Sequence, residues 1–322
     1  MKQAPIIVFS YNRPTHLSKT LDALAQNEFA SYSDLFIFCD GAKPNATEEQ
    51  TRCIYDNRRV AKAATGFRSV QVIERDSNYG LANNIIDGVS SIIDKYGEVI
   101  VLEDDMLTSP YFLRYMNAAL VFYKNRPGVM SICADRPPCN KMEIPDDYVY
   151  DVFACLRFYC YGWATWKDRW NKVDWSLDYL DVFLRHPEQI SAFNRGGDDM
   201  TNMLIAQRDG IVNSWAIRFG FAHFKEHCVA ILPCVPYVSN FGFDGTGVHC
   251  GVNQSNLYDN DLSLSVRDPR FLELLYEDAR IINAFYNNYS RKKRPLWQKG
   301  CNYIARRLGK KPPFVIKSKV YK

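Results

Sequence analysis

The sequence predicts an α/β fold in which a mostly parallel central sheet carries helices on both faces. Short apolar runs alternate with segments of helical periodicity over about the first 130 residues. Most of these runs lack the polar alternation of a half-exposed strand, so we expect both faces of the sheet to be buried. Two runs end in acidic residues, at the strand ends where such sheets bind ligands.

Five segments are expected to form the strands of this half. They share a high apolar content and polar or turn-forming borders, and they are residues 5–10, 34–40, 68–76, 98–105 and 128–133. Four helices are expected between them, beginning at Pro14, within 47–64, at Leu81 and at Ser109–Pro110. In the first helix, Leu17, Leu21 and Leu24 form one apolar stripe.

The rest of the chain is less regular and rich in aromatic residues from about 140 to 265. Ten cysteines are spread without C-x-x-C spacing, which indicates reduced thiols rather than a disulfide framework. His223 and His227 are four residues apart, but no Glu stands in the metalloprotease position. Packing is therefore the favoured interpretation over a zinc site.

Residues 291–322 form a basic tail with 12 basic residues and no acidic ones, whereas the remainder has 28 basic against 36 acidic residues. Trp297, Cys301, Ile304 and Leu308 share one helical face of this tail. That pattern favours a helix anchored on an anionic membrane surface. A solvated tail and a helix packed on the acidic body are the alternatives. No apolar run approaches the roughly 20 residues that span a bilayer.

The strand at 98–105 ends in three adjacent carboxylates, Glu103, Asp104 and Asp105. A helix cap explains them poorly, because Ser109–Pro110 is the better helix start; a solvated turn is the other structural interpretation. Adjacent carboxylates repel one another, which raises their pKa values unless a cation joins them. One or two carboxylates with phosphate oxygens commonly hold Mg²⁺ or Mn²⁺. No G-x-G-x-x-G or P-loop motif is present.

A series of motifs spans roughly residues 4–250: "VFSYNRP", "IFCDG", "SNYGLANN", "VLEDD", "YGWATWKDRW", "GGDDMTNML" and "YVSNFGFDGTGVH". In this order they resemble nucleotide-sugar-dependent glycosyltransferases of the type A fold, as in N-acetylglucosaminyltransferase I and related bacterial sugar transferases. The resemblance implies a Rossmann-like fold with a nucleotide-sugar-binding half at 1–135. An acceptor-binding and catalytic-base half at 136–265 and a helical basic extension at 266–322 would follow.

The resemblance also implies a role for individual residues. Asp105 would hold Mn²⁺ or Mg²⁺, and Asp198, or as second choice Asp199, would be the catalytic base. The donor nucleotide would be bound by Arg13, Asp40, Asn84 and Asp104, and the sugar or acceptor by Glu103, Trp163 and His249. The loop with Asn240 and Gly242 would close over the donor. Two positions depart from the pattern: Asn84 stands where the eukaryotic branch has His, and Gly197 where Trp is usual.

Structural alternatives remain open for several of these residues. Arg13 could be a surface cation, and Asp40 could cap the turn at Gly41. Asp198 and Asp199 could cap a helix running to Arg208. Trp163 lies in a Trp stripe of helical spacing that is typical of a core.

The implied reaction is a metal-dependent, inverting transfer of a hexose or N-acetylhexosamine from a nucleoside-diphosphate sugar, chiefly a UDP-sugar. The acceptor would be a hydroxyl of a glycan or lipid-linked glycan in bacterial surface polysaccharide or lipopolysaccharide synthesis. The short apolar run at the N-terminus indicates a cytoplasmic start, and the tail a peripheral position on the inner face of the cytoplasmic membrane.

Two rival functions are a sugar-nucleotide-synthesising nucleotidyltransferase and a non-catalytic membrane-binding module. The first lacks its Gly-rich signature after the first strand, and the second leaves the acidic strand ends unexplained. Nucleic acid is not an expected partner, because a body with net charge −8 is a poor surface for a polyanion.

Overall fold

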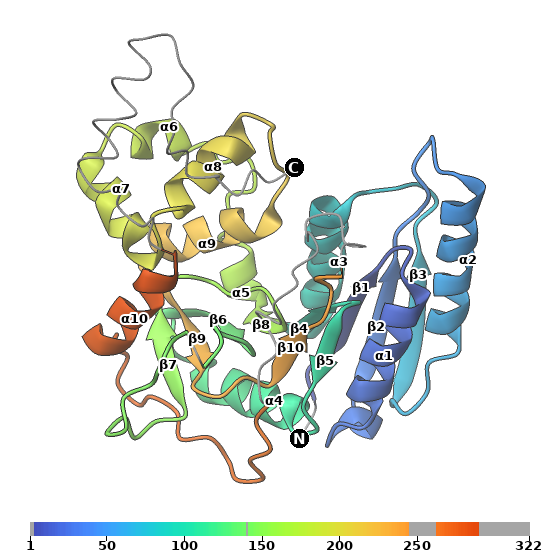
Figure 1. Cartoon of the computed structure of the whole chain (residues 1–322), viewed down its shortest axis with the longest axis horizontal. Helices are drawn as coiled ribbons and strands as arrows, with labels where there is room; N and C mark the ends of the chain where they lie inside the picture. Colours follow the sequence, from blue (N-terminus) through green and yellow to red (C-terminus); the bar gives the residue numbers. More distant parts are fainter. Residues whose placement is uncertain (1–2, 140, 245–261, 290–322) are drawn as a thin grey trace.

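The computed structural model describes residues 3–139, 141–244 and 262–289, and within them an eight-stranded sheet forms the centre of the molecule (Figure 1). Its strands are β1 (Ile6–Ser10), β2 (Asp34–Cys39), β3 (Ser69–Glu74), β4 (Glu98–Glu103), β6 (Val129–Cys133), β7 (Val152–Cys155), β8 (Trp163–Trp166) and β9 (Val229–Pro233). Their order in space is β3-β2-β1-β4-β8-β6-β9-β7.

The sheet is parallel on one side and mixed on the other. Strand β1 pairs in parallel with β2 and β4, and β2 pairs in parallel with β3. Strand β8 runs antiparallel between β4 and β6, while β6 and β9 are again parallel and β7 is antiparallel at the edge. The predicted α/β class with a mostly parallel sheet is therefore confirmed.

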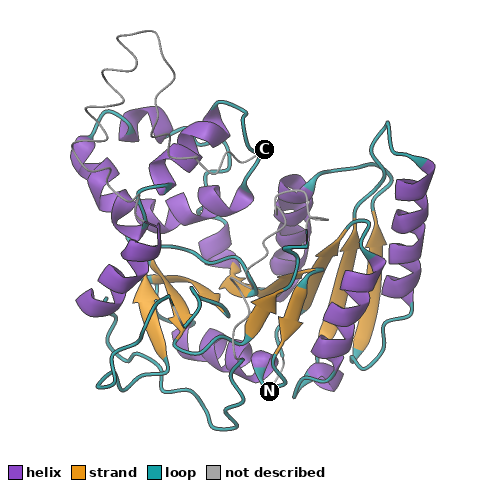
Figure 2. Ribbon diagram, in the orientation of Figure 1, coloured by secondary structure: helices purple, strands orange, loops and turns teal. Residues whose placement is uncertain are grey.

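Helices cover both faces of this sheet (Figure 2). They are α1 (Pro14–Ala25), α2 (Glu48–Lys62), α3 (Leu81–Tyr96), α4 (Phe112–Tyr123), α5 (Lys167–Trp170), α6 (Leu180–Phe183), α7 (Pro187–Phe193), α8 (Met200–Arg208), α9 (Trp215–Lys225) and α10 (Ala279–Tyr289), with 3-10 turns η1 (Ala30–Tyr32) and η2 (Asn194–Gly196). The short helices α6, α7 and α8 share an apolar cluster of their own with α9 (Figure 1).

Alternating strand residues divide the core into two layers. In β1, Ile6 and Val8 join the cluster that includes the buried faces of α1 and α4, whereas Ile7 and Phe9 join the cluster that includes α3, α9 and α10. Because successive strand side chains point to opposite faces, an all-apolar strand serves both layers. This burial explains why the strand signals contain so little polar alternation.

The starts of two helices in the structure can be compared with the starts expected from the sequence. Helix α2 begins after Thr47, whose side chain accepts from Gln50 N while Gln50 Oε1 accepts from Thr47 N, a reciprocal capping box. The helix expected at Ser109–Pro110 begins later, at Phe112. Residues 106–108 before it instead form strand β5 (Met106–Thr108), which pairs antiparallel with β10 (Val238–Asn240).

The expected boundary between the two halves, at residues 135 and 136, falls within one continuous sheet. Strand β6, from the first half, lies between β8 and β9, which both come from the second. Helix α10 belongs to the C-terminal extension expected from residue 266, and the basic tail at 291–322 lies outside the described residues. In the part of the chain that is described, no helix is both long and apolar enough to cross a membrane.

Candidate active site

The carboxyl ends of the central parallel strands bring the predicted residues together. Parallel pairing places Phe9 of β1 beside Glu103 of β4, and Ser10 beside Cys39 of β2. Arg13, Asp40 and the acidic cluster (Glu103, Asp104 and Asp105) therefore leave the same edge of the sheet. This edge is where open α/β sheets bind ligands.

Arg13 is the direct partner of the acidic cluster. Its Nη2 donates to Asp104 Oδ1 and to Asp105 Oδ2, the latter at 2.8 Å. The Arg13 side chain is 16% exposed, and the two Asp side chains are 5% and 7% exposed. Burial alone would lower the pKa of Arg13, but the two carboxylates raise it, so the guanidinium stays charged. Arg13 is thus no surface cation.

The cluster places three carboxyl groups beside one arginine. Burial, followed by the charges of Asp105 and Asp104, raises the pKa of Glu103. Burial also raises the pKa of Asp104, although Arg13 opposes this shift. The turn itself is fixed, because Asp104 O accepts from Thr20 Oγ1 at 2.8 Å and Thr20 Oγ1 accepts from Met106 N at 3.2 Å. A buried cluster of this kind gains from a further cation.

The residues fit a divalent cation at Asp105. Within the described residues, Asp105 Oδ1 is buried and has no hydrogen-bond partner. An uncompensated buried carboxylate oxygen is costly, and a hard cation would satisfy it. In the same ranges, no three His, Cys, Asp or Glu side chains form a complete metal site. The cation would therefore share its coordination with donor phosphate oxygens and water.

The segment after β10 packs directly on this cluster. Phe241 N donates to Asp105 O at 3.0 Å, and the Phe241 ring stacks on His16 at 5.0 Å between centroids. Asp244 Oδ2 lies 3.0 Å from His16 Nε2. A Cβ added to Gly242 would lie 2.1 Å from Asp105 Oδ2, so only glycine allows this approach. His249 lies outside the described residues.

Asp40 ties two loops together. Its carboxylate accepts from Gly41 N at 2.9 Å, Tyr79 N at 2.8 Å, Gly80 N at 3.0 Å and Asn78 Nδ2 at 3.0 Å. Asp40 thus caps the turn at Gly41, which is one of the interpretations of the sequence. It also holds the loop after β3 through hydrogen bonds from Asn78, Tyr79 and Gly80. Sequence reasoning missed this loop contact. Binding of the donor nucleotide by Asp40 stays a prediction.

Asn84 lies in the first turn of α3, where it contacts a residue that the sequence did not single out. Its Oδ1 accepts from Arg75 Nε at 3.0 Å. The Arg75 guanidinium lies 5.1 Å from the ring centroid of Phe38 and 4.4 Å from that of Tyr79. Arg75 also forms an ion pair with Asp87, and it lies next to the loop that Asp40 holds.

The expected place of Trp163 needs correction. Its side chain is 1% exposed and stacks with Trp170 and Trp215, at centroid distances of 5.7 and 5.0 Å. It lies in the apolar core beneath α9, because its position in β8 directs it to that face of the sheet. The core interpretation of the Trp stripe describes this side chain, and Trp163 presents no open platform for a sugar.

The two candidate bases lie side by side with different partners. Both oxygens of Asp199 accept from Arg157, at 2.7 and 2.9 Å, and the Arg157 guanidinium lies 3.8 Å from the ring centroid of Tyr289. Asp198 Oδ1 accepts from Tyr286 OH at 2.5 Å. Asp199 occupies the N-cap position of α8, but its side chain makes no capping hydrogen bond. Sequence reasoning missed all three partner residues, which are remote in the chain.

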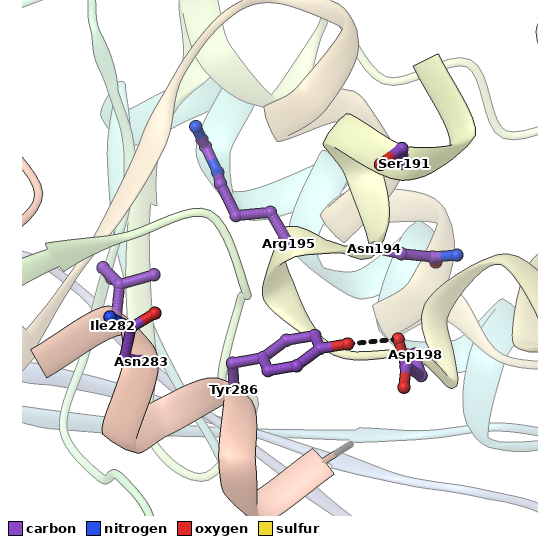
Figure 3. A pocket seen from close by; sticks show the side chains of 7 residues that line it. All are labelled: Ser191, Asn194, Arg195, Asp198, Ile282, Asn283 and Tyr286. Atoms are coloured by element: carbon purple, nitrogen blue, oxygen red, sulfur yellow. Dashed lines mark hydrogen bonds between the residues drawn. The ribbon is translucent and has the colours of Figure 1, made fainter. Parts of the chain in front are cut away.

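Asp198 also lines a pocket of about 400 Å³ beside α10 (Figure 3). The lining side chains come from three segments, and they are Ser191, Asn194, Arg195, Asp198, Ile282, Asn283 and Tyr286. In Figure 3 the Tyr286 ring extends across the pocket towards Asp198.

His223 is a core residue, as the packing interpretation predicts. Its Nε2 lies 2.7 Å from Ser131 Oγ and its Nδ1 lies 2.8 Å from Phe219 O. Burial lowers the pKa of His223 to about 4.

Comparison with known proteins finds a matching family model and a curated relative. The model of the GNT-I family matches residues 1–195. A curated relative from Arabidopsis thaliana, an alpha-1,3-mannosyl-glycoprotein 2-beta-N-acetylglucosaminyltransferase, is 25% identical over 201 residues, which cover 58% of this chain and 43% of the relative. The chain thus spans less than half the length of that relative.

Two solved structures are similar at a greater distance. Mannosyltransferase PcManGT from Pyrobaculum calidifontis, in complex with GDP-Man and Mn²⁺, has 14% identity and a TM-score of 0.36, covering 52% of this chain and 45% of its own. S. aureus TarS 1-349 has 11% identity and a TM-score of 0.39, covering 73% and 59%. At these TM-scores neither alignment says which ligand this chain binds.

Proposed function

The chain belongs to the GNT-I family, and we propose that it is a metal-dependent glycosyltransferase that moves a sugar from a nucleoside-diphosphate sugar to a hydroxyl of a glycan. The observation that carries this proposal is the cluster of Glu103, Asp104 and Asp105, in which both aspartates are buried. It contains an unpartnered oxygen on Asp105, in the described part of the chain, and one compensating cation, Arg13. A metal bound to a diphosphate supplies the charge that this arrangement lacks.

The donor is proposed to be a UDP-hexose or UDP-N-acetylhexosamine. The Arabidopsis relative carries N-acetylglucosaminyltransferase in its name, which supports the second sugar class. Asp40 and Asn84 border the base and ribose side of the proposed pocket, and Arg75 adds a cation between Phe38 and Tyr79 there. Asp104 would face the ribose and Glu103 the transferred sugar.

Mn²⁺ or Mg²⁺ at Asp105 would act as a Lewis acid on the donor diphosphate. Arg13 holds Asp104 and Asp105 in place and presents its positive charge where the diphosphate departs. Asp198 accepts the proton of the attacking hydroxyl, whereas Asp199 keeps Arg157 in position through both of its oxygens. The acceptor oxygen forms its bond to the anomeric carbon as the bond to the diphosphate oxygen breaks, which inverts the configuration.

The cellular setting is proposed from the sequence pattern of the tail. A basic amphipathic segment at 291–322 suits an anionic membrane surface, and a lipid-linked glycan acceptor would be met there. We place the reaction in bacterial surface polysaccharide or lipopolysaccharide synthesis, on the inner face of the cytoplasmic membrane. The nucleotidyltransferase and membrane-module alternatives are less well supported, because the family match covers the acidic strand end.

The proposal is tested by incubating the full chain with UDP-, GDP- and CDP-sugars and Mn²⁺ and measuring nucleotide release. Release from one donor class, lost on chelation and in Asp105→Ala, is the expected result. No release from any donor, or full metal-dependent turnover in Asp105→Ala, would refute it. The surface variant Asp209→Ala provides the matched control, because this carboxylate is exposed and pairs with neighbouring Arg208.

A further inference from the structure

The pocket beside Asp198 (Ser191, Asn194, Arg195, Asp198, Ile282, Asn283 and Tyr286) has walls of different origin. Ser191, Asn194 and Arg195 come from α7 and η2, and Asp198 from the turn before α8. The opposite wall is α10, which lies beyond the residues matched by the family model (Figure 3). The pocket thus joins residues inside the family match, Ser191, Asn194 and Arg195, with residues after it.

Helix α10, which forms one side of the pocket, is packed against the core. Ile281 and Phe285, one turn apart, are buried in the layer that also holds Phe153, and the Phe153 and Phe285 ring centroids are 6.4 Å apart. Ile282, Asn283 and Tyr286 project from the adjoining face into the pocket. Helical spacing thus gives α10 one face for the core and one for the pocket.

The chemistry of the pocket suits a neutral polyol. Asn283 and Ser191 offer an amide and a hydroxyl group that both donate and accept hydrogen bonds. Asn194 offers its amide nitrogen as a donor, because its Oδ1 already accepts from Thr201 N and Oγ1. The positive charge of Arg195 is already paired with Glu277 at 3.0 Å, and Asp198 adds a negative charge. An anionic ligand would meet two carboxylates against one guanidinium. The volume of about 400 Å³ falls within the range of small-molecule sites.

We propose that this pocket binds the acceptor, a neutral saccharide whose attacking hydroxyl donates to Asp198, and that α10 selects which saccharide is accepted. The inference rests on the proposed glycosyl transfer. The hydroxyl proton passes to Asp198, the hydroxyl oxygen bonds to the anomeric carbon, and the nucleoside diphosphate leaves with the electrons of the broken bond. Tyr286 is a positioning residue, because its hydroxyl donates to Asp198 Oδ1 at 2.5 Å and fixes that carboxylate.

Binding is tested first, without donor, by saturation-transfer NMR on the full chain. The probes are methyl glucoside, methyl galactoside, methyl mannoside and methyl N-acetylglucosaminide, with methyl glucuronide as the charged match of methyl glucoside. We expect saturation transfer to at least one neutral glycoside, lost in Asn283→Ala. No transfer to any of them, or stronger transfer to the glucuronide, would overturn the proposal.

The second test uses the best donor and the neutral glycoside that binds. Asn283→Ala should raise the acceptor KM roughly tenfold with the donor KM unchanged, because one hydrogen bond to the saccharide is lost. The matched control on the same helix is Asn288→Ala, whose amide donates to Lys141 O and Ala284 O. An acceptor KM in Asn283→Ala equal to that of the control would refute acceptor binding in this pocket. It would not refute the proposed glycosyl transfer. If no donor released its nucleotide, the proposed glycosyl transfer itself would be refuted.

Tyr286→Phe separates positioning from mere packing. A hydrogen bond donated to a carboxylate stabilises its charged form and lowers its pKa. Its loss should move the acidic limb of the kcat/KM profile to higher pH. An unshifted profile would show that Tyr286 does not act through Asp198.

Discussion

Arg13 Nη2 lies 2.8 Å from Asp105 Oδ2 and also bonds Asp104, so an internal cation compensates the carboxylates proposed to meet the metal. The other terminal nitrogen, Nη1, is buried and has no hydrogen-bond partner among the described residues. Arg13 thus pairs with the acids through one terminal nitrogen, and its second terminal nitrogen is a buried donor. A diphosphate that brings its own metal would give that donor a partner.

Replacing Arg13 should have opposite effects on metal and nucleotide. Arg13→Gln removes a charge that competes with Mn²⁺ for Asp105, so Mn²⁺ alone should bind several-fold more tightly at mildly alkaline pH. Binding of UDP with saturating Mn²⁺ should weaken roughly tenfold or more, because a charge-assisted hydrogen bond is lost. Electron paramagnetic resonance of free Mn²⁺ measures the first effect and calorimetry the second. Arg208→Gln, at a surface ion pair, is the control; weaker Mn²⁺ binding in Arg13→Gln would contradict the competition.

The two adjacent aspartates should separate in their mutant phenotypes. Asp198→Asn should lower kcat by about 10²- to 10⁴-fold, the usual contribution of a general base, with the donor KM little changed. Asp199→Asn should mainly lower the free energy of unfolding, by about 2 kcal/mol, because Arg157 loses its charged partner in a largely buried position.

Paired kinetics and urea denaturation of the two variants measure this separation. Asp209→Asn serves as the exposed control. A larger loss of kcat in Asp199→Asn than in Asp198→Asn would reverse the assignment of the base.

Metal binding should release protons near neutral pH. Burial and like charge raise the pKa values of Glu103 and Asp104, whereas a bound cation favours their ionised forms. Mn²⁺ affinity should therefore increase as pH rises through these raised values. In the metal-free protein the same shifts favour the folded state at low pH, and this contribution is lost as pH rises through the folded-state pKa values.

Calorimetric titration with Mn²⁺ in two buffers of different ionisation enthalpy counts the protons released. Identical heats in the two buffers would show that both carboxylates are already ionised.

His223 should give stability the opposite pH dependence. Its folded-state pKa of about 4 lies below the ordinary value of 6.5. Its contribution is complete above the unfolded value and declines as pH falls towards the folded value, by about 1.4 kcal/mol per pH unit. His223→Gln should flatten this decline in urea denaturation series, and the exposed His186→Gln should leave it unchanged. Equal slopes in wild type and His223→Gln would disprove the effect.

The sequence predicted most reliably those strands and helices whose formation depends on their own residues. Strands β1, β2 and β4 could be predicted because each is a short apolar run that ends in a polar turn, and α1 and α3 because their apolar residues recur at helical spacing. Asp40 and the acidic cluster could be expected at one edge because the ends of parallel strands meet there, whereas the bonds from Arg13 to Asp104 and Asp105 were not expected.

The parts that could not be predicted depend on contacts between remote segments. Trp163 has the same local sequence whether it faces a core or a ligand, and only the position of α9 over β8 makes it a core residue. Nothing near Asp198 in the chain indicates that Tyr286 will contact it, 88 positions later. The same holds for Arg157 and Asp199, whose pairing depends on the placement of two loops.

Strand β8 has a consequence for how the chain assembles. It completes the sheet between β4 and β6, and β6 then needs β9 at residues 229–233 as its other neighbour. The end of the family match at residue 195 is therefore not a place to truncate the protein. A fragment ending there would expose the hydrogen-bonding edge of β6 and invite aggregation. Because these pairings join distant parts of the chain, the closing of the sheet should be the slow step of folding.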